Sequence, residues 1–141
     1  MLKSIDLFAG AGGLSHGLIS EGFDVVAAVE IDPTSAKSYS LNHEKTNIII
    51  DDIRKVSGPS ILKQVGISAG ELDLLTGCPP CQAFSSLRTR KRKQNRDYSS
   101  KSLIIEMLRL IRSIRPKAII LENVPGLAND EHFLQFLKKC W

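Results

Sequence analysis

The sequence predicts an α/β fold in which a mostly parallel sheet carries helices on both faces. Short, nearly continuous apolar segments alternate with segments of helical periodicity along the chain. Apolar segments without polar alternation are typical of parallel strands, because helices bury both faces of such a sheet. At 141 residues the chain is long enough for one domain with a substantial core, and no repeat or internal boundary divides it.

Five strands and five helices are expected, in alternation. The expected strands cover residues 3–8, 23–30, 47–50, 72–76 and 117–121. The expected helices cover residues 14–21, 32–41, 58–65, 100–115 and 130–139. Residue 141 follows shortly after the fifth strand, so the predicted sheet is truncated after that strand.

Glycine, proline and aspartate support the elements of the first half. The run Ala9-Gly10-Ala11-Gly12-Gly13 favours a tight turn after the first strand, and Gly22 suits the end of the first helix. Asp32 is a good N-cap and Pro33 a good first-turn residue for the second helix. The third strand ends at Asp51-Asp52, and the helix that follows has the weakest pattern of the five.

A long polar and basic loop over residues 77–99 precedes the fourth helix. The apolar residues of that helix recur at helical spacing, namely Leu103, Ile104, Met107, Leu108, Ile111 and Ile114. Pro116 ends the helix, because proline cannot continue it. The last expected helix is amphipathic.

Composition argues against a membrane protein and against an exported one. The chain is 43% hydrophobic and 24% charged, and no apolar run approaches the roughly 18 to 20 residues that cross a bilayer. Asp6 lies where a signal peptide would be apolar. Three cysteines do not form a complete disulfide framework, so we expect a reducing, cytoplasmic location.

Unusual positions fall at the carboxyl ends of all five predicted strands. They are the glycine turn over 10–13, Glu30, Asp52, Cys81 and Glu122. The carboxyl ends of parallel strands share one edge of the sheet, and ligands of such folds bind beyond that edge. We therefore expect these residues to form one site.

The first three of these positions fit a nucleoside. Glycines let the backbone approach a ligand, although a lone glycine turn can simply be a tight turn, and Ser15 stands where a dinucleotide fingerprint requires its third glycine. Glu30 would accept both ribose hydroxyls and Asp52 an adenine amino group, although each acid alone is more often a solvated cap. Together they describe an adenosine site without a diphosphate cradle, which suits S-adenosylmethionine better than NAD.

The pair Cys78-x-x-Cys81 has three interpretations. A zinc half-site needs two more ligands, yet Cys140 is distant and the three histidines show no metal spacing. Redox pairs also follow strands, but they begin a helix, whereas Gln82 leads into a loop. The third interpretation makes Cys81 a nucleophile. For Cys78 itself, a small buried side chain is the simplest interpretation.

A nucleophile here suits methylation of cytosine, whose C5 is too weakly acidic to react directly at neutral pH. Addition of a thiolate to C6 makes C5 nucleophilic, and a proton or hydrogen bond at N3 eases that addition. Such a site needs a thiol, a carboxyl group and a methyl donor, which Cys81, Glu122 and the adenosine site would supply. Glu122 alone could be a surface acid, but it directly follows a parallel strand, which favours a function.

The net charge of +4 is unevenly distributed. Seven basic residues and one acid lie between Arg88 and Lys101, so that segment carries +6 and the rest of the chain −2. A charge run is usually a solvated face. This one follows the candidate nucleophile, where it would grip the phosphates around a cytosine flipped out of its stack. Charge alone does not read a DNA sequence.

Three motifs give the sequence a specific resemblance. Phe-Ala-Gly-x-Gly-Gly from Phe8, Pro-Pro-Cys-Gln-x-Phe-Ser from Pro79 and Glu-Asn-Val from Glu122 have the order and spacing of the N-terminal motifs of cytosine C5 DNA methyltransferases. The match runs from Asp6 to about Gly126. The resemblance implies a Rossmann-like S-adenosylmethionine-dependent methyltransferase fold, with residues 1–141 forming the N-terminal part of the catalytic domain.

The resemblance also implies a cofactor-binding set. Its expected members are Phe8, Ala9, Gly10, Gly12, Gly13, Leu14, Glu30, Ile31, Asp52 and Ile53. Phe8 would stack near the adenine, and the glycines would line the methionine end. The family usually has Gly-Asp where this chain has Asp51-Asp52, which leaves open which acid meets the adenine.

For the substrate, the resemblance implies that Pro80 orients the cytosine, Cys81 attacks C6, and Glu122 binds N3 and the exocyclic amine. In the family, the segment after Pro-Cys-Gln closes over the DNA. The expected contacts to double-stranded DNA are therefore Gln82, Ser85, Ser86 and Arg88.

We find no counterpart in these 141 residues for the family's Gln-x-Arg-x-Arg element, target-recognition region or C-terminal helix. We therefore expect a fragment, one half of a split enzyme with a complementary C-terminal partner, or a remnant, inactive or nearly so alone. An open edge at the fifth strand would favour self-association. Two alternative functions remain, an RNA (transfer RNA) cytosine methyltransferase and a non-catalytic module that binds DNA or cofactor.

Overall fold

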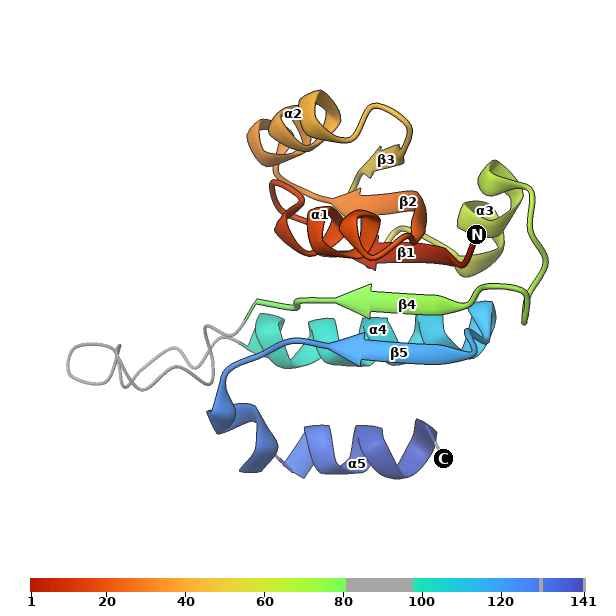
Figure 1. Ribbon diagram of the computed structural model, residues 1–141. Coiled ribbons are helices and arrows are strands. Elements are labelled where there is room, and N and C mark those ends of the chain that lie inside the picture. Colours follow the sequence, from red (N-terminus) through yellow and green to blue (C-terminus); the bar gives the residue numbers. More distant parts are fainter. Residues whose placement is uncertain (81–97, 130, 141) are drawn as a thin grey trace.

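The strands of the protein form a single parallel sheet. The computed structural model describes residues 1–80, 98–129 and 131–140 (Figure 1). Within these residues the sheet order is β3-β2-β1-β4-β5, and every neighbouring pair is parallel. The strands are β1 (Lys3–Leu7), β2 (Asp24–Glu30), β3 (Asn47–Ile50), β4 (Leu74–Gly77) and β5 (Ala118–Leu121). The predicted α/β class with a parallel sheet is confirmed.

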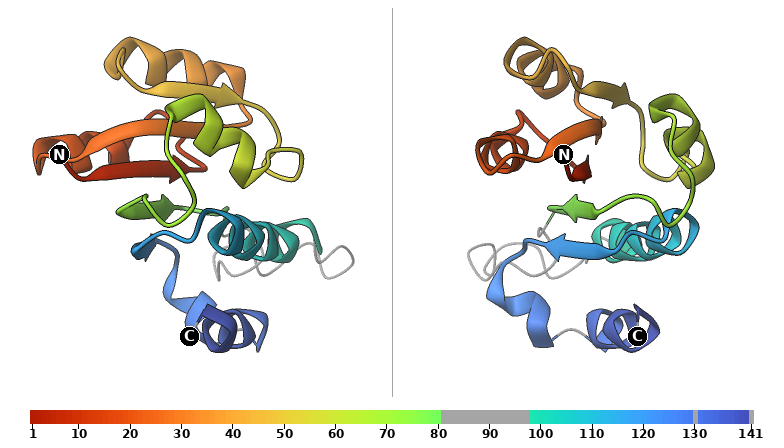
Figure 2. Two further views of the ribbon diagram at one scale, coloured as in Figure 1. Left: turned by 90° about the vertical axis from the view of Figure 1, so that its right-hand side faces the viewer. Right: turned by 45° about the vertical axis from the view of Figure 1, so that its right-hand side comes forward.

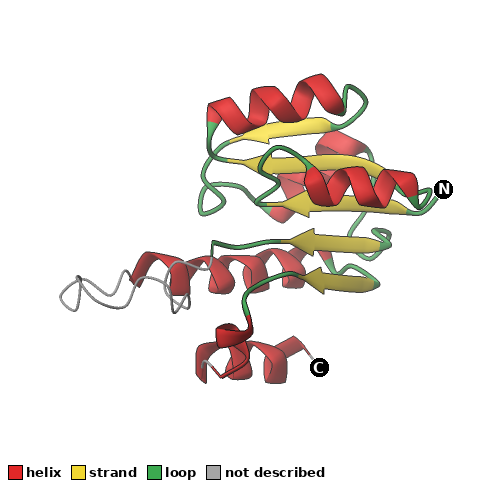
Figure 3. Ribbon diagram, turned by 60° about the vertical axis from the view of Figure 1, so that its left-hand side comes forward, coloured by secondary structure: helices red, strands yellow, loops and turns green. Residues whose placement is uncertain are grey.

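Helices cover both faces of this sheet. They are α1 (Gly13–Ser20), α2 (Pro33–Asn42), α3 (Gly58–Val65), α4 (Tyr98–Ile114) and α5 (Glu131–Cys140), with a short 3-10 helix, η2 (Pro125–Asn129), before α5. Helices α1 and α2 lie on one face, and α3 and α4 pack together on the other (Figures 2 and 3). None of the helices in the described ranges is long and apolar enough to cross a membrane.

Local signals set several element boundaries. The Asp32 carboxylate caps α2 by accepting a hydrogen bond from Ser35 N at 2.9 Å, and Pro33 occupies the first turn. Gly22, just past α1, has φ 83°, a left-handed conformation that glycine adopts without strain. Helix α4 ends one residue earlier than predicted, because Pro116 disfavours a right-handed helical conformation at Arg115, whose φ is 54°. The sequence did not predict η2.

The main core lies between the sheet and helices α3 and α4. Its fully buried side chains come from strands β1 and β4 and from both helices, and include Ile5, Leu7, Ile61, Leu75, Met107, Leu110 and Ile114. The apolar periodicity predicted for the fourth helix thus faces this core. Strands β1 and β4 are buried on both faces, which holds their carboxyl ends in place. The candidate site lies at these ends.

Strand β5 lies at one edge of the described sheet, as predicted from its place in the chain. The Ile119 and Ile120 side chains on this strand are 37% and 45% exposed. An edge strand that exposes apolar side chains and unpaired backbone groups is a template for pairing with another chain.

Candidate active site at the carboxyl ends of the strands

The candidate site lies where neighbouring strands send their connections in opposite directions. Strand β1 leads through α1 to β2 on one side, whereas β4 leads to β5 on the other, so a crevice opens between the ends of β1 and β4. A cavity of about 220 Å³ lies at this edge of the sheet, beyond the ends of β1, β2, β3 and β4. Its walls are formed by Phe8, Val29, Glu30, Ile31, Asp51, Asp52, Ile53, Arg54, Cys78, Pro80 and Leu103.

The turn between β1 and α1 forms the end of this site nearest the first helix. Phe8, Gly10 and Gly12 have φ values of 59°, 55° and 94°, so the backbone turns sharply in the left-handed region. A hydrogen bond of 2.9 Å from Gly12 N to Ala9 O closes the turn. At Gly12 a side chain would be obstructed, because an added Cβ would lie 2.5 Å from His43 Nε2.

Glu30, at the end of β2, holds this turn in place. One carboxylate oxygen accepts a hydrogen bond from Gly10 N at 2.7 Å, and the other accepts one from Asp32 N at 2.8 Å. Each oxygen of a carboxylate has two lone pairs, so each has one left for a ligand hydroxyl. Glu30 therefore both fixes the glycine turn and presents two acceptors to the cavity.

The two acids after β3 both reach the cavity, so its geometry does not separate them. Asp51 accepts a hydrogen bond from Asp52 N at 2.7 Å. Asp52 accepts from Arg54 N at 3.0 Å and pairs with the Arg54 guanidinium, with Nη2 at 2.6 Å from Oδ2. These hydrogen bonds from Arg54 lower the pKa of Asp52 to about 2. Asp52 is thus ionised and oriented at neutral pH.

The ends of β4 and β5 bring Cys78 beside Glu122. Gly77 and Leu121 are partners in the parallel ladder, and Glu122 N donates to Gly77 O at 3.1 Å. Burial, together with the negative charges of Asp6 and Glu122 and a hydrogen bond to the Glu122 side chain, raises the pKa of Cys78 to about 11. Cys78 therefore stays a neutral thiol at neutral pH. Cys78 was expected to be a small buried side chain, but it is only half-buried.

Asn123 fixes the segment that leads toward Cys81. Its Nδ2 donates to Pro79 O at 2.8 Å, and its Oδ1 accepts from Val124 N at 2.9 Å. The contact joins chain positions 44 residues apart. Asn123 thus ties the Cys-Pro-Pro segment to the strand end that carries Glu122.

Beneath the glycine turn lies a buried polar network that sequence reasoning missed. The Asp6 carboxylate, 1% exposed, accepts from Ser15 Oγ at 2.6 Å and from Thr76 Oγ1 at 2.9 Å. Tyr39 OH donates to Ser15 Oγ at 2.8 Å, and the His43 ring lies against Tyr39. Burial raises the pKa of Asp6 above its usual 3.8. The network links β1, β4, α1 and α2 under the turn.

The structure brings together part of the predicted set. Six of its members line the cavity, namely Phe8, Glu30, Ile31, Asp52, Ile53 and Pro80. Five further members, on the glycine turn and at the start of α1, do not line the cavity, namely Ala9, Gly10, Gly12, Gly13 and Leu14. Glu122 is connected to it through Cys78. The predicted residues that lie outside the described ranges are Cys81, Gln82, Ser85, Ser86 and Arg88.

Comparison of the sequence with known proteins shows that the chain is similar to cytosine-specific DNA methylases. A model of the family "C-5 cytosine-specific DNA methylase" matches residues 2–140. Type II methyltransferase M.XorII of Xanthomonas oryzae pv. oryzae is 38% identical over 135 residues, covering 96% of this chain and 31% of that protein. Type II methyltransferase M.AquIA of Picosynechococcus sp. is 38% identical over 127 residues, covering 90% of this chain and 50% of that protein. The chain thus spans half or less of these relatives.

Solved structures agree with the fold. A crystal structure from E. coli, described as a DNA modification methyltransferase encoded within a prophage, superposes with a TM-score of 0.79 at 31% identity, covering 99% of this chain and 36% of that chain. The S. pombe Dnmt2 methyltransferase gives a TM-score of 0.71 at 22% identity, covering 98% of this chain and 39% of that chain. The second likeness concerns the fold alone. The predicted Rossmann-like arrangement is confirmed.

Proposed function

The chain belongs to the C-5 cytosine-specific DNA methylase family, and from this premise we propose that it carries the cofactor site and the nucleophile of an enzyme that methylates C5 of cytosine in DNA. The observation that supports this most directly is the cavity itself. Phe8, Glu30 and Asp52, the expected nucleoside contacts, share it with Pro80, the residue directly before Cys81. The proposed nucleophile is therefore the next residue in the sequence after one that lines the nucleoside cavity.

We propose S-adenosylmethionine as the cofactor, and the described residues fit it. Glu30 has two free acceptor positions for ribose hydroxyls beside the glycine turn. Asp52 is ionised and can accept a hydrogen bond from an amine. Phe8, Ile31 and Ile53 give apolar walls for a base. When bound, the cofactor supplies an electrophilic methyl group.

For the reaction, we propose that the Cys81 thiolate forms a bond to C6 of cytosine while Glu122 holds N3. Electrons of the C5–C6 double bond then become available at C5, which makes C5 the nucleophile. C5 would then take the methyl group, with S-adenosylhomocysteine as the leaving group. A base such as water would take the C5 proton, the electrons of that C–H bond would re-form the C5–C6 double bond, and the thiolate would leave C6. Asn123 would act before this step, because it holds the segment preceding Cys81 through Pro79 O.

We also propose that the basic residues between Arg88 and Lys101 hold the DNA backbone around the flipped cytosine. Gln82, Ser85, Ser86 and Arg88 are the proposed contacts. In the sequence they lie within eight positions after Pro80, which forms part of the cavity wall.

Covalent trapping tests the proposed chemistry. A duplex with 5-fluorocytosine at the target position is incubated with S-adenosylmethionine and the chain supplied with its complementary C-terminal polypeptide. Fluorine at C5 cannot leave as a proton does, so we expect a stable protein–DNA adduct, with the peptide that contains Cys81 carrying the cross-link in mass spectrometry. Absence of an adduct from protein that binds the duplex would refute the nucleophile assignment.

We further propose that the rest of a working enzyme comes from a C-terminal half or a complementary subunit that docks at β5. The exposed Ile119 and Ile120 and the edge position of β5 support this surface. The relatives that the chain matches are at least about twice as long as the matched region, and their remaining length is enough for such a partner.

Without that partner, the chain is expected to self-associate through β5. Size-exclusion chromatography with light scattering should give a mass above that of one chain, with the proportion of dimer rising with concentration. Replacing Ile120 by lysine places a charge on the edge strand and should shift the equilibrium to monomer. A monomer that persists at high concentration in the unaltered chain would contradict the prediction.

A further inference from the structure

Arg109 connects helix α4 to the loop after β3, which carries Asp52. One guanidinium nitrogen, Nη2, donates to Ile53 O at 2.9 Å and to Val56 O at 2.8 Å. Its Nε donates to Glu106 Oε2 at 2.6 Å, one turn earlier on the same helix. The guanidinium is therefore held on one side by its own helix and clamps two backbone carbonyls on the other. These contacts span 56 and 53 residues of sequence.

The clamped loop is short and already turned on itself. Arg54 N donates to the Asp52 side chain, and Lys55 N donates to Asp52 O at 2.8 Å. The Ile53 and Val56 side chains are 4% and 7% exposed, which anchors the loop in the core. The backbone carbonyls of the same two residues accept the hydrogen bonds from Arg109. The turn that places Asp52 and Ile53 at the cavity is thus held from one side by its own buried side chains and from the other by Arg109 of α4.

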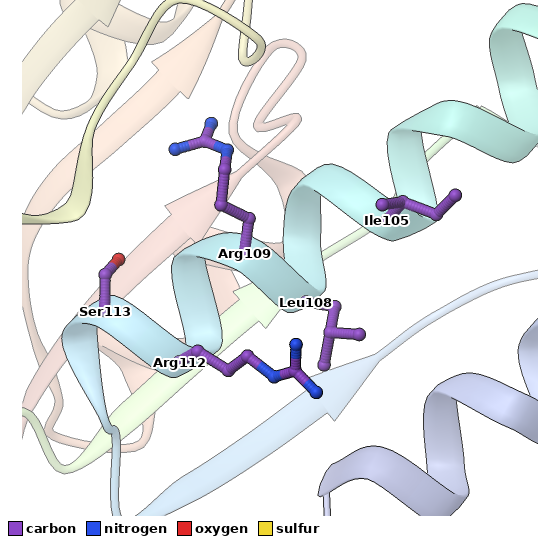
Figure 4. A pocket seen from close by; sticks show the side chains of 5 residues that line it. All are labelled: Ile105, Leu108, Arg109, Arg112 and Ser113. Atoms are coloured by element: carbon purple, nitrogen blue, oxygen red, sulfur yellow. The ribbon is translucent and has the colours of Figure 1, made fainter.

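Helix α4 also contributes directly to the same cavity, because Leu103 forms part of its wall. Arg109 leaves the helix toward the loop before α3. Arg112, one turn further on, extends in a different direction, along the helix (Figure 4). Both arginines line a shallower hollow along α4, with a volume of about 400 Å³, which lies away from the strand ends. The two residues carry the same charge on the same helix, but Arg109 is the one that donates to the carbonyls of the loop before α3.

We propose that Arg109 is a positioning residue for recognition of the cofactor's adenine, an inference that rests on the proposed binding of S-adenosylmethionine in this cavity. Arg109 fixes the turn from Asp52 to Val56 against α4, so that the Asp52 carboxylate and the Ile53 side chain meet the base in one geometry. Loss of the clamp frees two carbonyls and lets the turn shift. Discrimination at the exocyclic amine of the base would suffer most, because a directed hydrogen bond depends on geometry more steeply than apolar contact does.

The test compares two ligands by titration calorimetry, S-adenosylhomocysteine and S-inosylhomocysteine, which has a carbonyl in place of the exocyclic amine. The unaltered protein should prefer the adenosyl ligand. Arg109→Gln should weaken adenosyl binding about tenfold, the size of effect expected on losing hydrogen bonds to a charged group, and weaken inosyl binding much less. Arg109→Lys should restore part of the preference, because one ammonium can donate to both carbonyls.

Arg112→Gln is the matched control, since it removes the same charge from the same helix, and it should leave both affinities unchanged within about twofold. An Arg109→Gln protein that keeps its preference, or that loses both ligands equally, would overturn the positioning role. Failure of the unaltered protein to bind S-adenosylhomocysteine would instead contradict the cofactor proposal. In that case hydrogen exchange still tests whether Arg109 holds the loop. The amides of residues 53–56 should exchange faster in Arg109→Gln than in Arg112→Gln, and equal rates would refute the clamp.

Discussion

Replacing Cys81 by serine is expected to lower methyl transfer by at least about a thousandfold in the chain supplied with its complementary C-terminal polypeptide. A serine hydroxyl is far less ionised and less nucleophilic than a cysteine thiol, and loss of a covalent nucleophile typically removes most of the catalysed rate. The measurement is transfer of labelled methyl groups from S-adenosylmethionine to duplex DNA. Binding of S-adenosylhomocysteine should remain within about twofold, because serine removes no contact from the proposed adenosine site.

Cys78→Ser provides the contrasting variant three residues away. The serine hydroxyl can still donate to the Glu122 side chain, as the neutral Cys78 thiol does, so we expect less than about a tenfold loss of activity. Comparable losses in the two variants would show that the cysteine pair acts together and would contradict a single nucleophile. Retention of methyl transfer by Cys81→Ser would favour a non-catalytic binding module or another nucleophile.

Replacing Gly12 by alanine is expected to destabilise the fold by about 2–4 kcal/mol, from overpacking together with backbone strain. The added Cβ would lie 2.5 Å from His43 Nε2 and 2.9 Å from Tyr39 Cδ2. Both rings are buried, and Tyr39 is held by Ser15, so neither can move freely. The φ of 94° at Gly12 is also unfavourable for any residue with a side chain. Urea unfolding followed by circular dichroism measures the change.

The same turn offers two comparison glycines. Gly13 begins α1 with open space around its Cα, so Gly13→Ala should be neutral or slightly stabilising. Gly10 has φ 55° but no obstruction, so Gly10→Ala should cost only the backbone strain, about 1 kcal/mol. Equal stability of the Gly12 and Gly13 variants would contradict the tight packing of His43 against the turn.

Features that depend on neighbouring residues could be predicted from the sequence. Asp32 and Pro33 begin α2 as expected, and β3 and α3 occupy the predicted residues 47–50 and 58–65. Apolar continuity was enough to predict a parallel sheet. Strand β4 begins two residues later than predicted. At its start, the Asp73 side chain accepts a hydrogen bond from Lys3 N and pairs with Lys117, while the Asp73 backbone bonds to Lys3 O and Ala118 N. Such contacts between distant segments are not visible in a local pattern.

The candidate site shows the same division. Glu30 was predicted because it follows an apolar strand, but its hydrogen bond to Gly10 N depends on how β1 and β2 meet. Asp6 and Ser15 gave no functional signal in the sequence, and Ser15 indicated only a departure from a dinucleotide fingerprint. In the fold they are partners, because α1 packs onto β1 with Ser15 facing Asp6. Asn123 and Arg109 escaped prediction for a similar reason, since each contacts carbonyls more than 40 residues away.

The buried Asp6 also determines how this part of the fold responds to protons. Its pKa in the folded chain is raised above 3.8, so the folded state binds this proton more tightly than the unfolded state does. The contribution of Asp6 to stability is fully present below pH 3.8 and is lost as the pH rises through the folded-state pKa. Asp52 acts in the opposite sense, because its pKa of about 2 means that stability is lost as the pH falls toward that value. Proton uptake at Asp6 therefore partly offsets acid destabilisation at Asp52, and it favours the fold beneath the glycine turn at low pH.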